Sequence, residues 1–331
     1  MNRAQVDTLL RPASRILVMG ELILDEFIWG KVSRISPEAP VPVVEVVRET
    51  FHAGGAANVA RNLREFIQHV SLLGPTGEGR DAETLRNLLT SVGVQLEDAL
   101  HDPLYQTIRK TRIIARTQQM VRVDRERKSR LTDEVRQRAI AHFHGLLPSL
   151  DAVILEDYDK GLFDQPLADA LVAAAKAAGV PLLVDPKPSN PVRWRGVRGI
   201  TPNRSEAFRA AGLPWSEPVD PPLKDPALLE AGYRLLQEWD CAFVLVTLSE
   251  QGMLLFQPDA EPYHIPTRAQ EVFDVSGAGD TTIAVFTAAL AGGASLIEAA
   301  EIGNHAAGIV VGKLGTAIVT RAELLGSFPD A

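Results

Sequence analysis

The sequence predicts an α/β fold in which helices flank a central, mostly parallel β-sheet and a small β-sheet forms a lid. Short apolar runs of strand length alternate with segments of helical pattern along much of the 331-residue chain. The apolar runs are continuous, which is typical of parallel strands buried on both faces. Strand–helix alternation in turn implies right-handed βαβ units, the building blocks of α/β proteins.

The strands of the central sheet are expected at five apolar runs. The first, residues 15–20, ends in glycine, and the second, residues 151–155, is followed by acidic residues. The other three runs cover residues 181–185, 199–202 and 242–247. The helical patterns lie between the runs, over residues 55–66, 82–92, 132–147, 165–178 and 228–239.

Two regions depart from this alternation. Residues 31–50 and 107–124 have strand-like sequences in which polar and apolar side chains are mixed. Such mixing is typical of strands that have one face in water. We therefore expect these two regions to form the lid, outside the main sheet.

Composition and charge exclude several classes of protein. The net charge of −8 argues against nucleic acid as a partner, because phosphate backbones require clustered cations. The single cysteine, Cys241, excludes an intramolecular disulfide and a cysteine-only metal site. The longest apolar stretches have about ten residues, whereas a membrane span needs ~20, and the first 15 residues lack a signal-peptide pattern. We expect a cytoplasmic protein with no membrane partner.

The residues that follow the apolar runs are the expected place of the chemistry. In open α/β sheets, ligands bind outside the carboxyl ends of the strands. These positions are rich in carboxylates, lysine and asparagine, as a cleft for phosphates and sugars would be. They are residues 21–25, 156–160, 185–187, 203–206 and 247–252.

A glycine-rich turn before a predicted helix is the strongest single motif. Gly277, Ala278 and Gly279 allow backbone N–H groups to approach an anion at the helix N-terminus. Asp280 follows at once and has two interpretations. It could cap the helix, or it could take a proton from a hydroxyl group aimed at a phosphoryl group.

A second glycine motif precedes the helical pattern near residue 55. Gly54 and Gly55 permit close approach of the backbone to a ligand, and Asn58 carries both a donor and an acceptor for hydroxyl groups. The alternative is a tight turn with a capping asparagine.

Four segments together resemble the signatures of the PfkB/ribokinase family of sugar kinases. Residues 274–280 resemble the C-terminal signature D-T-x-G-A-G-D, with Val275 where threonine is commoner. The other three are Gly54-Gly55-x-x-Asn58 with Gly74 downstream, Asn203-x-x-Glu206, and Gly20 followed five residues later by Asp25. The resemblance spans about residues 14–325 and implies a ribokinase-like fold with one kinase domain over residues 1–331.

The resemblance also implies roles for the site residues. Asp280 would be the catalytic base and residues 277–279 the anion hole. Asn203 and Glu206 would hold Mg²⁺ and its waters, although Glu206 could equally be an acid in the first turn of a helix. It also implies that the sugar is bound by Asp25, Gly54, Gly55 and Asn58. The co-substrate ATP would be bound by Asn203, Glu206, Ser249, Glu250, Gly252, Asn304 and Gly308.

Two details of the nucleotide side go beyond these assignments. Ser249 stands where the family has a glycine of its T-x-G-x-x-G loop. Some relatives bind K⁺ beside the anion hole, and the resemblance extends this K⁺ site to carbonyl groups near Asp274 and Gly315.

A narrower resemblance, to the heptose 7-phosphate kinases, covers the lid. It lies in residues 35–44, 107–112 and 118–126, and in residues 156–161, where Glu156 replaces the serine of S-D-Y-x-K-G. It implies ATP-dependent phosphorylation of the C1 hydroxyl of D-glycero-β-D-manno-heptose 7-phosphate to the 1,7-bisphosphate, in ADP-heptose and lipopolysaccharide core biosynthesis. Many relatives carry a nucleotidyltransferase domain as well; here we expect a stand-alone kinase.

A sugar phosphate requires cations for its remote phosphate group. The candidates are Arg109, Arg112, Arg122, Lys160 and Lys187. The apolar strand at residues 41–47 also favours a homodimer that forms through the lid. The alternatives are another sugar kinase of the family, such as a ribokinase or fructokinase, and a non-catalytic sugar-phosphate sensor.

Overall fold

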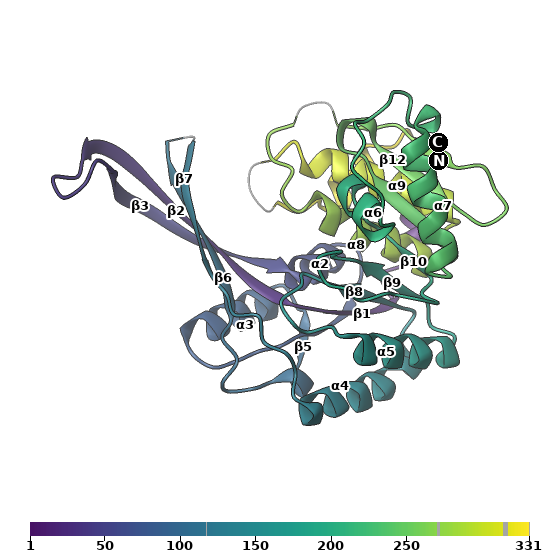
Figure 1. The fold of residues 1–331 in the computed structure, drawn as a ribbon, viewed down its shortest axis with the longest axis horizontal. Coiled ribbons are helices and arrows are strands. Elements are labelled where there is room, and N and C mark those ends of the chain that lie inside the picture. Colours follow the sequence, from purple (N-terminus) through teal and green to yellow (C-terminus); the bar gives the residue numbers. More distant parts are fainter. Residues whose placement is uncertain (117, 270–271, 314–316, 331) are drawn as a thin grey trace.

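Two β-sheets organise the chain in this computed structural model, which describes residues 1–116, 118–269, 272–313 and 317–330 (Figure 1). The central sheet has the order β13-β12-β11-β10-β9-β8-β1-β4-β5, and the second sheet has the order β3-β2-β6-β7. From β5 to β11 all neighbours in the central sheet are parallel, while β12 and β13 are antiparallel additions. The predicted α/β class with a mostly parallel sheet is confirmed.

Five of the nine central strands in the described residues, β1, β8, β9, β10 and β11, lie in the predicted apolar runs, although residues 199–202 contribute a strand of only two residues; β4, β5, β12 and β13 were not predicted. Their bounds are β1 Arg15–Gly20, β4 His69–Leu73, β5 Gln95–Glu97, β8 Ala152–Glu156, β9 Leu182–Asp185, β10 Gly199–Ile200, β11 Phe243–Thr247, β12 Met253–Phe256 and β13 Tyr263–Ile265.

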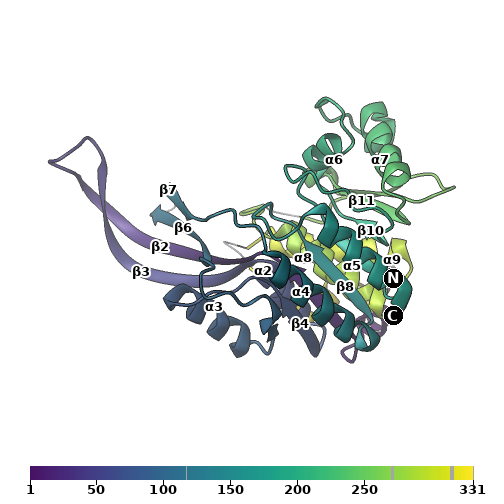
Figure 2. The ribbon, with the colours of Figure 1, turned by 60° about the horizontal axis from the view of Figure 1, so that its bottom comes forward.

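Helices cover both faces of the central sheet. In β1, Ile16 and Val18 point into one apolar core, and Leu17 and Met19 point into another. Helices α2, α8 and α9 pack in the first core, and helices α4, α5 and α7 pack in the second (Figures 1 and 2). This double burial explains why the strands are continuously apolar. The helices are α1 Arg3–Leu9, α2 Ala56–Arg64, α3 Arg80–Ser91, α4 Asp133–Leu146, α5 Gln165–Ala178, α6 Arg204–Ala210, α7 Pro226–Glu238, α8 Ala278–Ala291, α9 Leu296–Val310 and α10 Arg321–Gly326.

The second sheet is the lid, and its long β2–β3 hairpin extends away from the body of the molecule (Figure 2). Its strands are β2 Leu22–Ile35, β3 Pro42–Gly55, β6 Ile108–Ala115 and β7 Gln118–Arg125. The strand β2 therefore begins nine residues before the expected lid boundary at residue 31. Residues 22–27 are buried and largely apolar, so their sequence is like that of a central strand, although they pair within the lid.

None of the helices in the described residues combines the length and the apolar character that crossing a bilayer requires.

The C-terminal segment packs onto α9 through a histidine. The ring of His305 stacks on Phe328 with 4.0 Å between centroids, and its Nδ1 lies 3.0 Å from the hydroxyl of Ser327. Burial lowers the pKa of His305 to about 4, and the positive charges of Arg268 and the amino terminus act in the same direction. The folded protein therefore disfavours protonation of this ring.

We expect this histidine to make the folded state sensitive to acid. The free energy of unfolding that neutral His305 contributes is fully present above the ordinary histidine pKa of 6.5. It is lost as the pH falls toward about 4, because the unfolded chain then binds a proton that the folded chain does not. In urea unfolding from pH 7.5 to 4, the stability of His305→Gln should therefore fall less steeply than that of the wild type. Parallel curves for the two proteins would contradict this.

Candidate active site

Acidic residues converge at the carboxyl ends of the central strands. Glu156 at the end of β8 is the register partner of Gly20 on one side and of Asp185 on the other. The N-terminus of α8 brings Asp280 to the same place, where carboxylate oxygens of Glu156, Asp185 and Asp280 lie within 4.8 Å of one another. The ends of β8 and β9, two of the five strand ends that we expected to carry the chemistry, thus meet in one cluster.

Asp280 is held by two hydrogen bonds from distant parts of the chain. The Nδ2 of Asn58, on α2, donates to Asp280 Oδ2 at 2.7 Å, and the hydroxyl of Tyr158 donates to Oδ1 at 2.9 Å. Burial raises the pKa of Asp280, whereas these two hydrogen bonds act to lower it. The carboxylate is therefore fixed in orientation and supported in its ionised form.

A second network holds Asn58 in place. The amide of Asn62 donates to the backbone carbonyl of Asn58 at 2.9 Å, and the hydroxyl of Thr281 donates to Asn62 Oδ1 at 3.1 Å. This network packs α2 against α8. Asn58 contacts Asp280 directly, a role that a capping asparagine would not have.

Glu21 positions the turn that carries Tyr158. It follows β1, is 1% exposed, and accepts backbone N–H groups of Tyr158 at 2.9 Å, Lys160 at 3.0 Å and Leu162 at 3.2 Å. Burial raises the pKa of Glu21, and these N–H groups oppose that rise. Sequence analysis placed both Glu21 and Tyr158 among the residues at strand ends but assigned neither a role.

The glycines of the two motifs have different surroundings. A Cβ on Gly54 would lie 2.1 Å from Asp25 Oδ2, so this glycine permits β3 to pack against the aspartate. Gly277 has a φ of +82° and closes the turn before α8. A Cβ on Gly279, in contrast, would meet nothing within 4 Å. The first turn of α8 is therefore open on that side, as an anion-binding helix terminus would be.

One face of the lid carries Asp25 together with basic side chains. Asp25 and Phe27 are register partners of Lys110 and Arg112, so these four side chains share one face. On that face the Arg112 guanidinium forms an ion pair with Asp25 and lies 5.1 Å from the Phe27 ring centroid.

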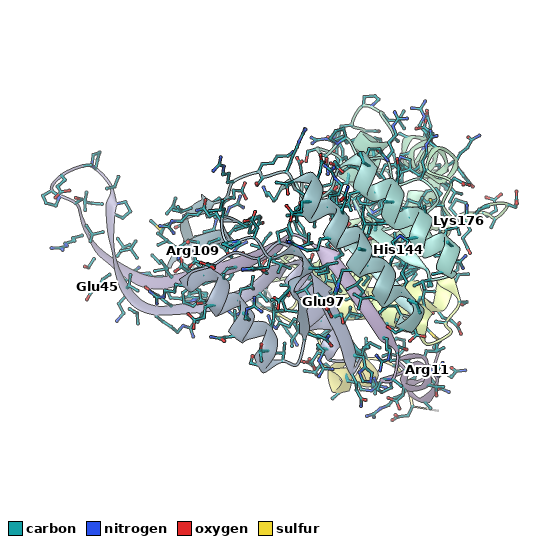
Figure 3. The ribbon with its side chains drawn as sticks, turned by 90° about the horizontal axis from the view of Figure 1, so that it is seen from below. Arg11, Glu45, Glu97, Arg109, His144 and Lys176 are labelled. Carbon is teal, nitrogen blue, oxygen red and sulfur yellow. The ribbon has the colours of Figure 1, made fainter. Side chains whose placement is uncertain are left out.

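Arg109 lies on the opposite face of the lid from Asp25. It pairs with Asp81 of α3 at 2.9 Å and with Glu26 at 3.4 Å, near the base of the lid (Figure 3). We expected Arg109 and Arg112 at the same sugar mouth. Residues three apart on a strand point to opposite faces, so this strand cannot present both to one ligand.

The other predicted cations are also paired with carboxylates. Arg122 pairs with Asp124 at 2.9 Å, and Lys160 pairs with Glu126 at 2.7 Å. Lys187 pairs with Glu206 at 2.7 Å, on the side of the predicted nucleotide site. Each of these lysines and arginines therefore already has a partner within the chain.

Lys110 is a basic residue that the sequence analysis missed. It is half-buried beside Asp25, and it forms no ion pair with any described residue within 4 Å. Burial lowers the pKa of Lys110, and the nearby charge of Asp25 opposes this. Side chains two residues apart on a strand share a face, so the position of Lys110 two residues before Arg112 would have identified it as a candidate.

The predicted metal residues form the start of a helix. Asn203 caps α6: its Oδ1 accepts the N–H of Glu206 at 3.0 Å, and a Glu206 oxygen accepts the N–H of Asn203 at 3.0 Å. This capping box is the structural alternative that the sequence left open. The oxygens of both side chains are engaged in this structure: Asn203 Oδ1 also accepts the hydroxyl of Ser205 at 2.9 Å, and Glu206 Oε1 accepts the ammonium group of Lys187 at 2.7 Å.

Of the remaining nucleotide-side residues, Asn304 and Gly308 lie on α9, and Ser249, Glu250 and Gly252 lie between β11 and β12. Ser249 adopts a φ of +53°, a conformation that suits the glycine of the family motif. Asn304 donates to the carbonyl of Pro266 at 2.7 Å, which is a packing contact. Gly252 and Gly308 each lie against backbone atoms, and Glu250 is exposed. For the K⁺ site, Asp274 accepts the N–H of Ser276 at 2.9 Å, and Gly315 lies outside the described residues.

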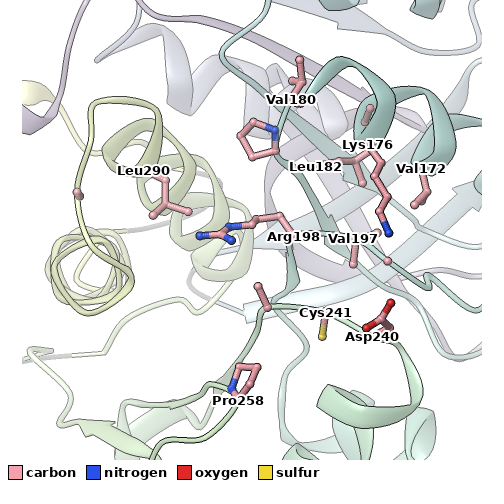
Figure 4. A pocket seen from close by; sticks show the side chains of 16 residues that line it. Val172, Lys176, Val180, Leu182, Val197, Arg198, Asp240, Cys241, Pro258 and Leu290 are labelled. Atoms are coloured by element: carbon pink, nitrogen blue, oxygen red, sulfur yellow. The ribbon is translucent and has the colours of Figure 1, made fainter.

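A cavity of about 760 Å³ lies elsewhere in the molecule. It is at the amino-terminal ends of β9, β10 and β11, and Val180, Arg198 and Cys241 are among its lining residues (Figure 4). It is thus at the opposite end of the strands from the acidic cluster, so cavity size does not identify the site.

The chain resembles proteins of a known family along most of its length. The model of the pfkB family of carbohydrate kinases matches residues 13–322. The chain is 44% identical over 98% of its length to the "Bifunctional protein HldE" of Desulfatibacillum aliphaticivorans, and 40% identical over 99% of its length to that of Geobacter sulfurreducens. It spans 65% and 66% of these two relatives.

Solved structures of low sequence identity share the fold. Phosphofructokinase-2 from Escherichia coli in complex with potassium has a TM-score of 0.75 at 17% identity, covering 95% of this chain and 97% of that chain. Arabidopsis thaliana ribokinase, complexed with ribose and ATP, has a TM-score of 0.68 at 19% identity, covering 96% of each chain.

The chain belongs to the pfkB family of carbohydrate kinases. Its fold is ribokinase-like, and it is a sugar kinase, which transfers a phosphoryl group to an alcohol.

The hydroxyl of Tyr158 should influence the pH at which the enzyme loses activity. Because its hydrogen bond favours the ionised form of Asp280, removing it in Tyr158→Phe raises the pKa of Asp280. We expect Asp280 to act as a base, and a base must be ionised, so activity should fall as the pH drops through that pKa. The acidic limb of the kcat/KM profile should move to higher pH in Tyr158→Phe.

Tyr263 provides a matched control for this experiment, since its hydroxyl bonds to Glu301 on α9, away from the cluster. Tyr263→Phe should leave the profile in place. An acidic limb that is the same in Tyr158→Phe and the wild type would show that this hydrogen bond does not act on the base.

Proposed function

We propose that the protein transfers the γ-phosphoryl group of ATP to the C1 hydroxyl of D-glycero-β-D-manno-heptose 7-phosphate, giving the 1,7-bisphosphate for ADP-heptose and lipopolysaccharide core synthesis. The observation that carries the proposal is the fixed carboxylate of Asp280, on which the charge of Asp25 in the lid acts; Asp25 shares its face of the lid with Lys110 and Arg112. Identity of 40–44% to relatives named HldE supports the choice of a heptose.

Each part of the site has a role in this proposal. Asp280 accepts the proton of the sugar hydroxyl, and Asp25 and Asn58 orient the sugar. The backbone N–H groups at the start of α8, over residues 277–279, stabilise the charge that develops on the phosphoryl group. This division suits phosphoryl transfer, in which positioning and electrostatics supply most of the catalysis.

The nucleotide side requires Mg²⁺, which neutralises phosphate charge when it is bound with ATP. Asn203 and Glu206 are the residues that would hold it through water, and their oxygen atoms are the donors that a hard cation prefers. Lys187, paired with Glu206, would orient that carboxylate. The nucleotide loop would include Ser249, Glu250 and Gly252, with Asn304 and Gly308 from α9.

Replacement of the base is the direct test of the catalytic role. Asp280→Asn keeps the shape of the side chain but cannot accept the proton, so kcat should fall ~10²–10⁴-fold. The affinities for sugar and ATP should change by no more than a few-fold. ATP turnover with heptose 7-phosphate and equilibrium binding measure the two effects. A variant that keeps more than a tenth of the wild-type kcat would remove Asp280 from this role.

Lys110 is the residue that should recognise the phosphate of the sugar. A charge-assisted hydrogen bond to phosphate contributes ~1.5–3 kcal/mol. Lys110→Met should therefore lower kcat/KM for heptose 7-phosphate by roughly 10–150-fold, with little change for unphosphorylated heptose or in the KM for ATP. Steady-state kinetics with both sugars measure this.

Lys31 is the matched control for Lys110, because it is an exposed lysine farther out on β2. Lys31→Met should keep the wild-type kinetics. Equal losses with the two sugars in Lys110→Met would mean that Lys110 does not contact the phosphate. If the wild type itself used the unphosphorylated sugar equally well, a ribokinase- or fructokinase-like activity would replace the heptose assignment.

Two further proposals concern assembly and location. The lid exposes Val41, Val46 and Val47, an apolar stretch that would be covered in a homodimer formed through the lid. Light scattering at micromolar concentration tests this, and a strict monomer would refute it. The proposed pathway also implies that the protein is cytoplasmic. Fractionation of the producing cells tests this location.

A further inference from the structure

The turn after β8 is held by a second segment besides the start of the lid. This segment is the connection between the lid strand β7 and helix α4, residues 126–132. The backbone N–H of Ser129 donates to the carbonyl of Lys160 at 3.1 Å. The ammonium group of Lys128 pairs with the carboxylate of Asp159. Two contacts of different kinds therefore join the connection to two consecutive residues of the turn.

Gly161 allows the connection to pack closely against the turn. Its φ is +104°, and a Cβ on it would lie 2.5 Å from the carbonyl oxygen and 3.1 Å from the nitrogen of Ser129. A larger residue would push the two segments apart. Asp159 also has a positive φ, of +57°, and neighbouring contacts must maintain such a backbone in a residue other than glycine. The conformation of the turn therefore depends on contacts from outside it.

The charged side chains of the turn find their partners in the same connection. Burial acts to raise the pKa of Asp159, but hydrogen bonds from Lys128 and Ser189 outweigh burial and lower it. Lys160 forms the complementary pair, because its ammonium group lies 2.7 Å from Glu126. The connection thus compensates a negative and a positive side chain of the turn.

The turn sets the position of the Tyr158 hydroxyl. Glu21 accepts the backbone N–H of Tyr158 at 2.9 Å, and the hydroxyl donates to Asp280 Oδ1 at 2.9 Å. A displacement of the turn by about 1 Å would take the hydroxyl out of hydrogen-bond range. Glu21 binds only N–H groups of the turn, so its carbonyl and side-chain contacts with the connection are a separate restraint.

We propose that Lys128 and Ser129 are positioning residues for the base: by holding the turn, they keep the Tyr158 hydroxyl within hydrogen-bond distance of Asp280. They act through Tyr158 and not on the substrate. The proposal rests on the role proposed for Asp280 in the reaction. Because the connection continues from β7, it ties the end of the lid to the geometry of the base.

Fluorine-19 NMR of the full-length protein, with 3-fluorotyrosine in place of its four tyrosines, reports the surroundings of Tyr158 without a measurement of activity. The resonance of Tyr158 is assigned by its loss in Tyr158→Phe. Ser129→Pro, which lacks the backbone N–H, and Lys128→Met should each shift this resonance. Tyr233 and Tyr263 lie in α7 and β13, and their unchanged resonances would show that the fold is intact.

Three matched variants serve as controls. Ser129→Ala keeps the backbone N–H, and Lys128→Arg keeps the positive charge. Arg130→Met removes an exposed neighbouring cation that forms no ion pair with any described residue. Each of the three should leave the Tyr158 resonance where it is in the wild type.

Steady-state kinetics test the consequence for the reaction. In Ser129→Pro, kcat should fall roughly two- to tenfold, the range that corresponds to one hydrogen bond. The KM for the sugar should stay within about twofold of the wild-type value, because the turn acts on the base. In the Tyr158→Phe background, Ser129→Pro should lower kcat no further, because the contact through which it acts is already absent.

Several results would contradict the proposal. An unshifted Tyr158 resonance in both variants, or a loss of kcat that persists in full in the Tyr158→Phe background, would overturn it. A raised KM for the sugar with a normal kcat would overturn it too, because the connection would then act on sugar binding. If Ser129→Pro disturbs the Tyr233 and Tyr263 resonances, Lys128→Met decides. The NMR measurement requires no sugar, so failure of the heptose assignment is distinguishable from failure of this inference.

Discussion

The hydrogen bonds that Asp280 accepts are the interaction on which the rest of the site depends. Asn58 donates from α2, Tyr158 donates from the turn after β8, and Asp280 itself lies in the first turn of α8. Burial alone would favour the protonated carboxyl group, which cannot act as a base. The two donors oppose that effect and also fix α2, α8 and the β8 turn relative to one another.

This arrangement is joined to the lid at Glu21, and also where β3 runs directly into α2. Glu21 separates β1 from β2, so it lies where the chain leaves the central sheet and enters the lid. Its carboxylate binds three backbone N–H groups in the turn that carries Tyr158. The start of the lid and the turn that carries Tyr158 are therefore held together by Glu21. A buried carboxylate is tolerated there because those N–H groups replace its water.

Charge pairing decides which cations of the lid are available to a ligand. Arg109, Arg112, Arg122 and Lys160 all contact carboxylates of the chain. Lys110 has no such contact among the described residues. An anion that enters beside Asp25 would therefore meet this lysine without displacing an internal partner. A count of lysines and arginines in the sequence cannot reveal that difference, because it depends on which face each side chain occupies.

The α/β class, five of the nine described central strands and the glycine-rich turn before Asp280 could be predicted from the sequence alone. These features follow from local properties, namely continuous apolar runs and glycine at a turn. Tertiary structure decided the partners of Asp280, 222 and 122 residues away in the chain, and the meeting of Glu156 with Asp185. Crossover connections set the strand order, and only that order brings these strand ends to one edge of the sheet. Tertiary structure also decided which side chains share a face of the lid. The pairing of β2 with β6 places Lys110 on the same face as Asp25 and Arg109 on the opposite face.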